Sequence, residues 1–513
     1  MDNIYAKQGL VVKKVKHAFQ KLISEDPTES MYMVDTLQSL GIEHHFQEEI
    51  EAALQKQHLI FTNIDLTAFA SNHKLYDLAL PFRLLRQKGY YVDADVFDSL
   101  KSNKREFREK YGEDVKGLVA LYEASKLSIE GEDSLDEAGY LSYQLLYAWL
   151  TRHKEHHEAV YIANTLQHPL HHGLSRFRDP GVLLNDFKTQ KECTSLKELA
   201  EINSYIVRFM NQNEIIQVYK WWKDLGIGQE VKFGRYETLK WYMWPMACFT
   251  DPSFSEQRIQ LTKPISLVYI IDDIFDVYGT LDQLTLFTDA VNRWELGGTE
   301  QLPAFMKRCL SVLYDITNDF ADMIYKKHGL NPIDTLKRSW VRLLNAFLKE
   351  AQWLNCGCLP RSEEYLKNGI VSTGVDVVLV HAFFLLDECI NKETVAIVDN
   401  FPQIIHSVAK ILRLSDDLEG TKSEDQKGLD GSYIDCYMNE HQDVSSEETE
   451  GHVAYLISTE WKHLNRELLT SNRLPSSFTN FCLNAARMVR LMYNYGSNPG
   501  LSNLLQQIQI LLH

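Results

Sequence analysis

Apolar residues recur every three or four positions along most of the chain. Two clear sets near the N-terminus consist of Met33, Val34, Leu37 and Leu40, and of Leu75, Leu78, Phe82 and Leu85. This spacing places the apolar side chains on one face of an α-helix. We see no run of strand-and-turn units and no repeat of fixed length. The pattern therefore predicts an all-α protein built from helical bundles.

The character of the predicted helices changes near residue 215. Before this point they are weakly apolar and contain several histidines; after it, Trp221, Trp222, Trp241 and Trp244 precede long apolar helices. The length of 513 residues allows more than one domain, because a domain holds about 150 residues. We predict a helical domain over residues 1–215 and a second helical domain over residues 216–513 that carries the candidate chemistry.

Composition and charge narrow the classes of protein. Hydrophobic residues make up 45% of the chain, and a net charge of −17 argues against a nucleic-acid partner. The longest apolar stretch, residues 377–386, contains His381 and is shorter than the roughly 18 residues that a transmembrane helix needs. We expect no transmembrane segment. The eight cysteines are scattered, which favours free thiols in a reducing compartment.

A first acidic cluster lies in an apolar segment, residues 261–279, where Pro264 suits a helix start and Gly279 a helix end. Asp272 and Asp276 are four positions apart and share one face of this helix, with Asp273 beside them. Buried carboxylates repel one another, so they need a compensating charge. A Mg²⁺ site satisfies this need, because carboxylates leave room for water and phosphate oxygens around the ion. Capping of a neighbouring helix, or pairing with Arg or Lys, stays open as an alternative.

A second acidic cluster follows the apolar segment that ends at Leu414. Asp416, Gly420 and Glu424 lie at i, i+4 and i+8 along a helical stripe, and Arg413 lies one turn before Asp416. A solvated, charged helix end is the alternative for this stretch taken alone. Two carboxylate clusters on two apolar helices predict a cleft that holds several Mg²⁺ ions and a diphosphate.

At these motifs the sequence resembles a plant class I terpene synthase over essentially the whole chain. The matching segments are Asp272-Asp273-Ile-Phe-Asp276 with Val277-Tyr278-Gly279-Thr280, Asp416-Asp417-Leu418 ending in Glu424, Trp221-Trp222-Lys223-Asp224-Leu225-Gly226, and Phe82-Arg83-Leu84-Leu85-Arg86-Gln87. The resemblance implies a non-catalytic N-terminal helical domain. It also implies a C-terminal class I terpenoid synthase α-bundle that binds a prenyl diphosphate.

The resemblance assigns metal-binding roles to both clusters. It implies that Asp272 and Asp276 bind two of three Mg²⁺ ions, with Asp273 in support, and that Asp416 and Glu424 bind the third. Mn²⁺ is an alternative ion. The family usually has Ser or Thr where this chain has Gly420, so water or Thr421 is expected to substitute for the missing hydroxyl ligand.

The resemblance also assigns residues that bind the substrate. Arg235 matches the first arginine of an upstream pair, and Arg413 matches the arginine before the second metal motif. Both are implied to bind diphosphate, for which a planar guanidinium is well suited. Lys427 is a further candidate for diphosphate contact, with a solvated loop lysine as the alternative. Trp244 matches an active-site tryptophan that stabilises a carbocation by cation–π attraction.

Several positions depart from the family pattern and point to a subgroup. Glu237 replaces the second arginine of the upstream pair, and residues 493–500 lack an Asp-Gly-Tyr element. The N-terminal part has no paired arginines followed by tryptophan. These departures resemble the subgroup that forms acyclic tertiary alcohols. We therefore expect geranyl or farnesyl diphosphate to be converted to linalool or nerolidol.

Other functions remain open at this point. They are a synthase that forms cyclic or acyclic hydrocarbons, a chain-elongating prenyltransferase, and a carrier without catalysis. His153 and His157 share a helix face, but no glutamate follows His153 to complete a zinc-protease motif, so packing or surface roles are expected. The first twenty residues lack signal-peptide and transit-peptide composition. We expect a monomer in the cytoplasm, or in the plastid stroma if a transit peptide has been removed.

Overall fold

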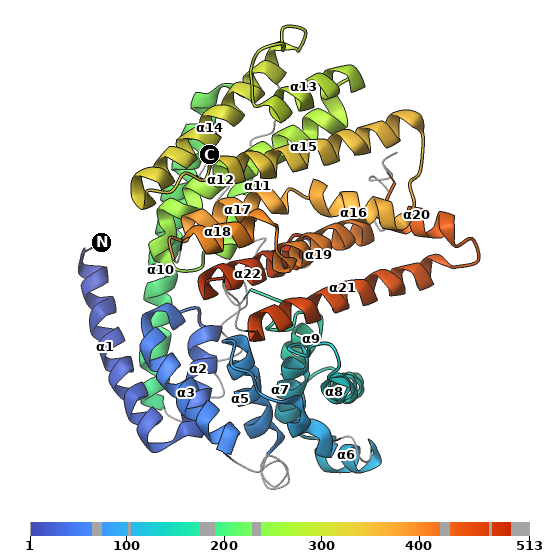
Figure 1. Cartoon of the computed structure of the whole chain (residues 1–513). Helices are drawn as coiled ribbons and strands as arrows, with labels where there is room; N and C mark the ends of the chain where they lie inside the picture. Colours follow the sequence, from blue (N-terminus) through green and yellow to red (C-terminus); the bar gives the residue numbers. More distant parts are fainter. Residues whose placement is uncertain are drawn as a thin grey trace. The chain divides into compact units, whose positions relative to one another are not determined.

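The computed structural model describes the chain except residues 1, 64–73, 101–103, 157, 175–189, 228–236, 389, 421–430, 471–473 and 494–513. Its described residues contain helices and no strand, which confirms the predicted all-α class (Figure 1). They fall into two compact units. The first unit contains the described residues up to Phe209 and residues 465–470. The second unit contains the described residues from Met210 to Leu464 and from Leu474 to Tyr493.

The first unit is built from helices on which buried apolar residues recur at the predicted spacing. These helices are α1 (Asp2–Glu25), α2 (Pro27–Ser39), α3 (Gln47–Asn63), α5 (Leu75–Gln87), α6 (Lys104–Tyr111), α7 (Val115–Ser125), α8 (Asp133–Arg152), α9 (Ala159–Gln167) and the first part of α10 (Gln190–Leu225), with 3₁₀ turns at Glu43–Phe46 and Ala94–Leu100. Leu37, Leu78, Phe82 and Leu85 all lie in its core. The non-catalytic role of this unit stays a prediction.

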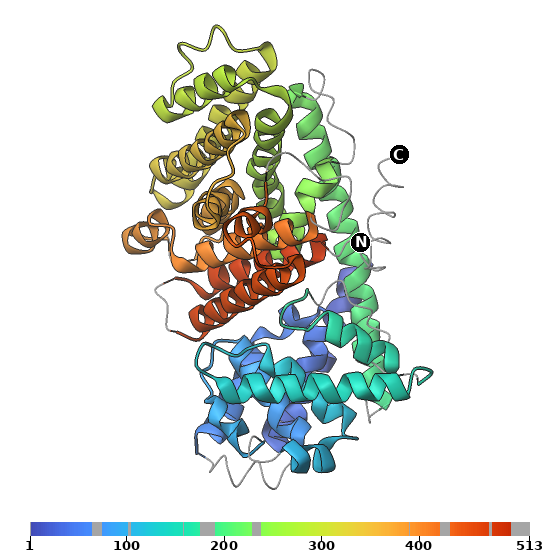
Figure 2. The same ribbon diagram turned by 90° about the vertical axis from the view of Figure 1, so that its right-hand side faces the viewer.

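The second unit holds the second part of α10 and the remaining helices, except that the end of α21 from Asn465 belongs to the first unit. They are α11 (Glu237–Cys248), α12 (Ser255–Asp273), α13 (Leu281–Arg293), α14 (Ala304–His328), α15 (Ile333–Cys356), α16 (Ser362–Ser372), α17 (Val375–Leu385), α18 (Lys392–Asp399), α19 (Gln403–Gly420), α20 (Tyr433–Glu440), α21 (Ser446–Leu469) and α22 (Ser476–Tyr493), with a 3₁₀ turn at Pro252–Phe254 and a π-helical turn at Ile274–Tyr278. Figure 2 shows the same helices turned by 90°.

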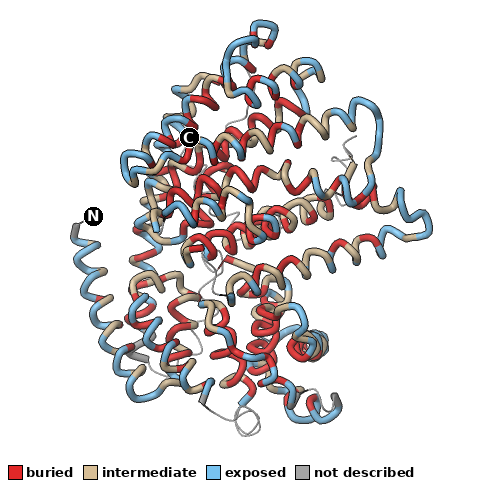
Figure 3. The backbone as a smooth tube through the Cα atoms, in the orientation of Figure 1, coloured by how far each residue is buried: buried red, intermediate tan, exposed pale blue. Residues whose placement is uncertain are grey.

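Helix α17 is the central helix of the second unit. It contacts α12, α15, α19 and α22, and all of its residues except Val378 are buried (Figure 3). A helix that is apolar all round belongs inside a protein core or a membrane. The stretch Ser362–Leu385, interrupted by a turn at Gly374, is long and apolar enough to cross a membrane, but 83% of its most apolar window is buried within the structure. This burial identifies it as a core element of the bundle.

The cysteines partly differ from the expectation of free thiols. Cys248, Cys309, Cys436 and Cys482 are free and buried. Cys356 and Cys358, in contrast, form a disulfide across Gly357, whose positive φ of 64° turns the chain at the end of α15. The sequence pattern did not predict this turn.

Candidate active site

Helix α12 presents the first acidic cluster. The helix begins at Ser255, nine residues before Pro264, so the predicted start at Pro264 is wrong. Arg258 fixes this earlier start, because its guanidinium bonds the carboxylate of Glu214 at 2.7 and 2.8 Å and the backbone oxygen of Phe249 at 2.9 Å. These contacts anchor the first turn of α12 to α10 and to the end of α11.

A stripe along one side of α12 is only partly buried. Val268, Tyr269, Asp272 and Asp273 are only partly buried, whereas Ile270 and Ile271 lie in the core. Asp276 follows in the π-helical turn that ends the segment before Gly279, and it is exposed. Turns of this kind are frequent at functional sites. The three aspartates therefore occupy the open face of an otherwise buried helix.

Asp272 lies where negative charge is concentrated. Burial raises the pKa of its carboxyl well above the ordinary value, and the neighbouring carboxylates of Asp276, Glu350 and Asp273 raise it further, while Arg413 acts in the opposite direction. Within the part of the chain that the structure describes, Asp272 makes no ion pair with lysine or arginine. A simple Asp–Arg pair is therefore not seen at Asp272 among the described residues, and the negative charge around this carboxyl suits a cation.

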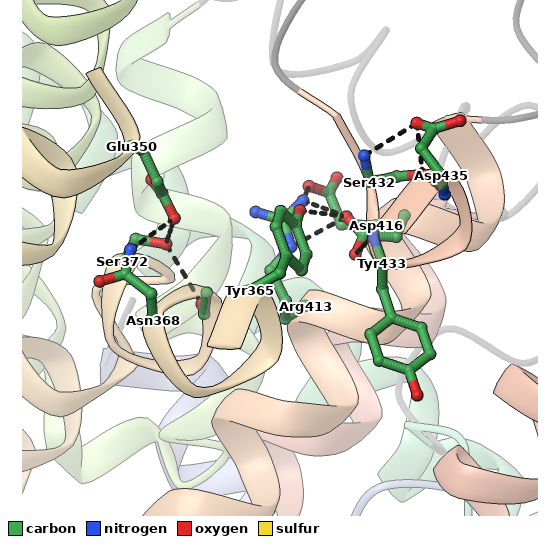
Figure 4. Close-up of polar contacts among 11 residues, drawn as sticks. Glu350, Tyr365, Asn368, Ser372, Arg413, Asp416, Ser432, Tyr433 and Asp435 are labelled. Atoms are coloured by element: carbon green, nitrogen blue, oxygen red, sulfur yellow. Dashed lines mark hydrogen bonds and ion pairs between the residues drawn. The ribbon is translucent and has the colours of Figure 1, made fainter. Parts of the chain in front are cut away.

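Glu350 is an acidic neighbour that the sequence analysis missed. It lies on α15, one turn after Phe347, whose ring is 5.5 Å from the ring of Phe275 in the acidic motif. Its Oε1 accepts hydrogen bonds from Ser372 at 2.6 Å and from Asn368 at 3.1 Å, both on α16 (Figure 4). The signal that could have found it is a glutamate on the same stripe as the buried Leu343, Ala346 and Phe347.

The second acidic cluster lies at the end of α19. Arg413 bonds Asp416 Oδ2 at 2.5 Å and Asp417 Oδ1 at 2.6 and 2.9 Å. Burial alone lowers the pKa of the Arg413 guanidinium, but Asp417, Tyr365, Asp416 and Glu350 raise it well above its ordinary value. Arg413 is therefore a fixed positive charge beside this cluster.

Helix α16 links the two clusters. Tyr365, Asn368 and Ser372 share one face of α16, at i, i+3 and i+7 (Figure 4). The hydroxyl of Tyr365 donates to Asp417 at 3.1 Å, while Asn368 and Ser372 hold Glu350. One helical face thus bonds Asp417 of the second cluster and Glu350, the acidic neighbour of the first.

Trp244 lies near the first cluster. Its indole Nε1 donates a hydrogen bond to the hydroxyl oxygen of Tyr269 at 2.9 Å, and the side chain is only partly buried. Trp241, Tyr242 and Phe249 are core residues in contrast. The Trp244 indole is therefore held beside Tyr269, one turn before Asp272 on α12.

Some predicted residues cannot be located. Arg235, Glu424 and Lys427 lie outside the described residues, as does Thr421, and Gly420 is the last described residue of α19. The side chains of Glu237 and Tyr493 are likewise not described. Among the described residues no three His, Cys, Asp or Glu side chains converge into a ready-made metal cage. Mg²⁺ commonly takes one or two carboxylates from a protein and completes its shell with water and phosphate oxygens.

Comparison with known proteins identifies the family. Residues 223–463 match the metal binding domain of the terpene synthase family, and residues 2–170 match the terpene synthase N-terminal domain. The chain is 78% identical over 512 residues to a chloroplastic neryl diphosphate diphosphatase of Glycine max, covering 100% of this chain and 96% of that protein. It is 43% identical over 496 residues to a chloroplastic S-(+)-linalool synthase of Arabidopsis thaliana, covering 96% and 86%.

A solved structure agrees with these matches. The isoprene synthase of grey poplar, in complex with three Mg²⁺ ions and dimethylallyl-S-thiolodiphosphate, has a TM-score of 0.86 and 30% identity, covering 96% of this chain and 94% of that one. The fold is thus that of the class I terpenoid synthases. This chain belongs to the terpene synthase family and is a class I enzyme, a lyase that acts on prenyl diphosphates and uses a divalent metal cofactor.

Proposed function

We propose that the enzyme converts a ten-carbon prenyl diphosphate to an acyclic alcohol and inorganic diphosphate. The observation that carries this proposal is the 78% identity over the whole chain to the neryl diphosphate diphosphatase. It favours neryl diphosphate, which the sequence analysis did not consider, with nerol as the product. The 43% identity to a linalool synthase favours the second candidate, water addition at the tertiary carbon to give linalool. Nerolidol from farnesyl diphosphate is the longer-chain form of that second candidate.

The residues present fit Mg²⁺ as the cofactor. Asp272 and Asp276 would hold two ions, and Asp416 with Glu424 a third, because these positions supply carboxylate oxygens and negative charge is concentrated around Asp272. When bound, the ions neutralise the diphosphate and make it a better leaving group. Gly420 brings no side-chain ligand, so this position relies on water. Mn²⁺ has the same ligand preferences.

The chain's own residues orient the substrate and protect the product cation. Arg413 donates to diphosphate oxygens, and Arg235 and Lys427 are proposed as further diphosphate contacts. Cleavage of the C–O bond leaves both electrons on the diphosphate and an allylic cation on the hydrocarbon. Trp244 stabilises this cation through its ring face. One water then adds to the cation and loses a proton to solvent or diphosphate, which completes the alcohol.

The decisive experiment separates substrates and bond cleavage. The purified chain is incubated with Mg²⁺ and, separately, with neryl, geranyl and farnesyl diphosphate in ¹⁸O-labelled water, and volatile products are identified by gas chromatography and mass detection. We expect an acyclic alcohol that carries ¹⁸O, because C–O cleavage takes its oxygen from water. Unlabelled alcohol indicates P–O cleavage and contradicts the mechanism. Cyclic or acyclic hydrocarbons as the main products contradict the alcohol assignment.

We further propose that the enzyme works in plastids. Both relatives named above are chloroplastic proteins. A monomer remains our expectation for the oligomeric state. Fractionation of the tissue that expresses the chain, with size-exclusion chromatography of the extracted enzyme, tests both points.

A further inference from the structure

Among the carboxylates of the second cluster that the structure describes, Asp417 accepts the most hydrogen bonds. It accepts four hydrogen bonds, two from Arg413, one from the hydroxyl of Tyr365 at 3.1 Å and one from the backbone N–H of Tyr433 at 3.0 Å. Three of these bonds end on Oδ1 and the N–H of Tyr433 bonds Oδ2, so the carboxylate is held through both of its oxygens. Its side chain is only 2% exposed. Asp417 is therefore a fixed anchor.

Asp416 differs from its neighbour. Its side chain is 46% exposed and bonds Arg413 through Oδ2 alone. It can leave Arg413 and turn to a cation, whereas Asp417 keeps hold of the guanidinium through both Nε and Nη2. The remaining nitrogen, Nη1, donates to no atom in the described part of the chain. One edge of the guanidinium is thus free for diphosphate.

The path of the Arg413 side chain depends on Gly369. This glycine lies on α16 next to the α19 side chain, and a Cβ at position 369 would be 2.7 Å from Arg413 Cδ and 3.1 Å from Cγ. The contact involves the middle of the arginine chain, whose far end is held by Asp417. Any larger residue at 369 therefore has to push Arg413 out of its position.

We propose that Asp417, Tyr365 and Gly369 form a socket that positions Arg413 for diphosphate binding. Asp417 supplies the charge, Tyr365 bonds Asp417 from α16, and Gly369 leaves the space. These three are positioning residues, since they act through Arg413. The socket also separates the roles of two adjacent aspartates, because Asp417 retains the arginine when Asp416 releases it. The inference rests on the proposed role of Arg413 as a diphosphate ligand.

The test measures binding of inorganic diphosphate in the presence of Mg²⁺ to the full chain by titration calorimetry. We expect Gly369→Ala to raise the dissociation constant about tenfold or more, because charge-assisted hydrogen bonds from Arg413 are displaced. Tyr365→Phe is expected to raise it about threefold, since the lost hydrogen bond acts on Arg413 only through Asp417. Gly451→Ala on α21 is the matched control, because a Cβ there meets nothing within 4 Å.

A double-mutant cycle separates positioning from general damage. In an Arg413→Ala background the added methyl group of Gly369→Ala has no arginine to displace, so the effect on diphosphate binding should vanish. A persistent effect, or unchanged binding in Gly369→Ala alone, overturns the socket. Asp417→Asn extends the series where it folds, and thermal melting checks that every variant is folded.

The same measurements distinguish this inference from the proposed function. If wild type yields no acyclic alcohol but the cycle behaves as expected, the socket stands and the product assignment falls. If Arg413→Ala binds diphosphate as tightly as wild type, both the ligand role of Arg413 and the socket are contradicted. The product assignment is then decided separately, by the identity of the volatile products formed by wild type.

Discussion

The indole N–H of Trp244 on α11 donates a hydrogen bond to the hydroxyl of Tyr269 on α12, with 2.9 Å between Nε1 and the oxygen. Tyr269 lies one turn before Asp272 on the same open stripe, and Lys240 lies 4.8 Å from its ring centre. The orientation of the proposed cation-stabilising ring is thus set from the helix that carries the first acidic cluster.

Tyr269→Phe should leave the Trp244 indole in place but remove the hydrogen bond that fixes its orientation. Loss of one buried hydrogen bond costs about 1 kcal/mol, so we expect kcat to fall less than about tenfold while minor products increase. Product distribution by gas chromatography is the measurement. Tyr278→Phe, at an exposed tyrosine in the π-helical turn, is the control and should leave the distribution unchanged. Identical product ratios in both variants contradict a positioning role for Tyr269.

Asp272→Asn should separate activity from stability. The substitution removes a proposed metal ligand, so turnover is expected to drop by at least about 100-fold. In the absence of metal the same change should raise Tm, because the charged form of Asp272 is disfavoured by burial and by Asp276, Glu350 and Asp273. Calorimetric melting of both proteins in the presence of a chelator measures this. A lower Tm for the variant rules out a repulsive cluster.

Metal affinity should depend on pH at this cluster. Burial raises the pKa of Glu350, as it does that of Asp272, so both bind protons at a higher pH than exposed carboxyl groups do. Protons compete with the cation for ionised ligands, so Mg²⁺ affinity is expected to weaken as pH falls. Glu350→Gln should flatten this dependence and weaken Mg²⁺ binding severalfold. Fluorescence titration with Mg²⁺ between about pH 5 and 8 tests it.

His381 makes stability depend on pH through the core. Burial lowers its pKa to about 4 from an ordinary 6.5, because the ring packs 4.8 Å from that of Phe320 and its Nε2 has no partner in the described structure. The unfolded chain therefore binds the proton first as pH falls below 6.5. The stability that the neutral His381 ring contributes is fully present above pH 6.5. This contribution is lost as the pH falls toward 4, by up to about 3 kcal/mol.

Variants of two histidines isolate this contribution. His381→Phe should show a smaller fall of Tm between about pH 6.5 and 4.5 than wild type. His406→Gln, at an exposed histidine of α19, is the control for removal of one imidazole. Parallel curves for His381→Phe and wild type contradict the assignment.

The helices and the placement of the aspartates could be predicted from the sequence because both depend on local spacing. Asp272 and Asp276 share a face through the period of their own helix, and the resemblance to terpene synthases extended this to Arg413. The start of α12 was missed, because it is set by Arg258 contacting Glu214 on another helix. A local pattern does not record such partners.

The remainder of the site depends on packing between helices. Glu350, Asn368 and Ser372 look like ordinary polar positions on amphipathic helices, and only the contact of α15 with α16 brings them to the acidic cluster. The different roles of Asp416 and Asp417 were also hidden, since adjacent residues of a helix point in different directions. The proposed ten-carbon neryl substrate rests on comparison with a relative alone.

The close approach of α16 to Arg413 also limits which substitutions at position 369 can be retained during evolution. A chain that keeps arginine at position 413 has to keep glycine at position 369, because a single added methyl group occupies the path of the arginine. A lineage that loses the arginine is released from that requirement. Positions 369 and 413 should therefore change together among descendants of this fold, although 43 residues separate them in the chain.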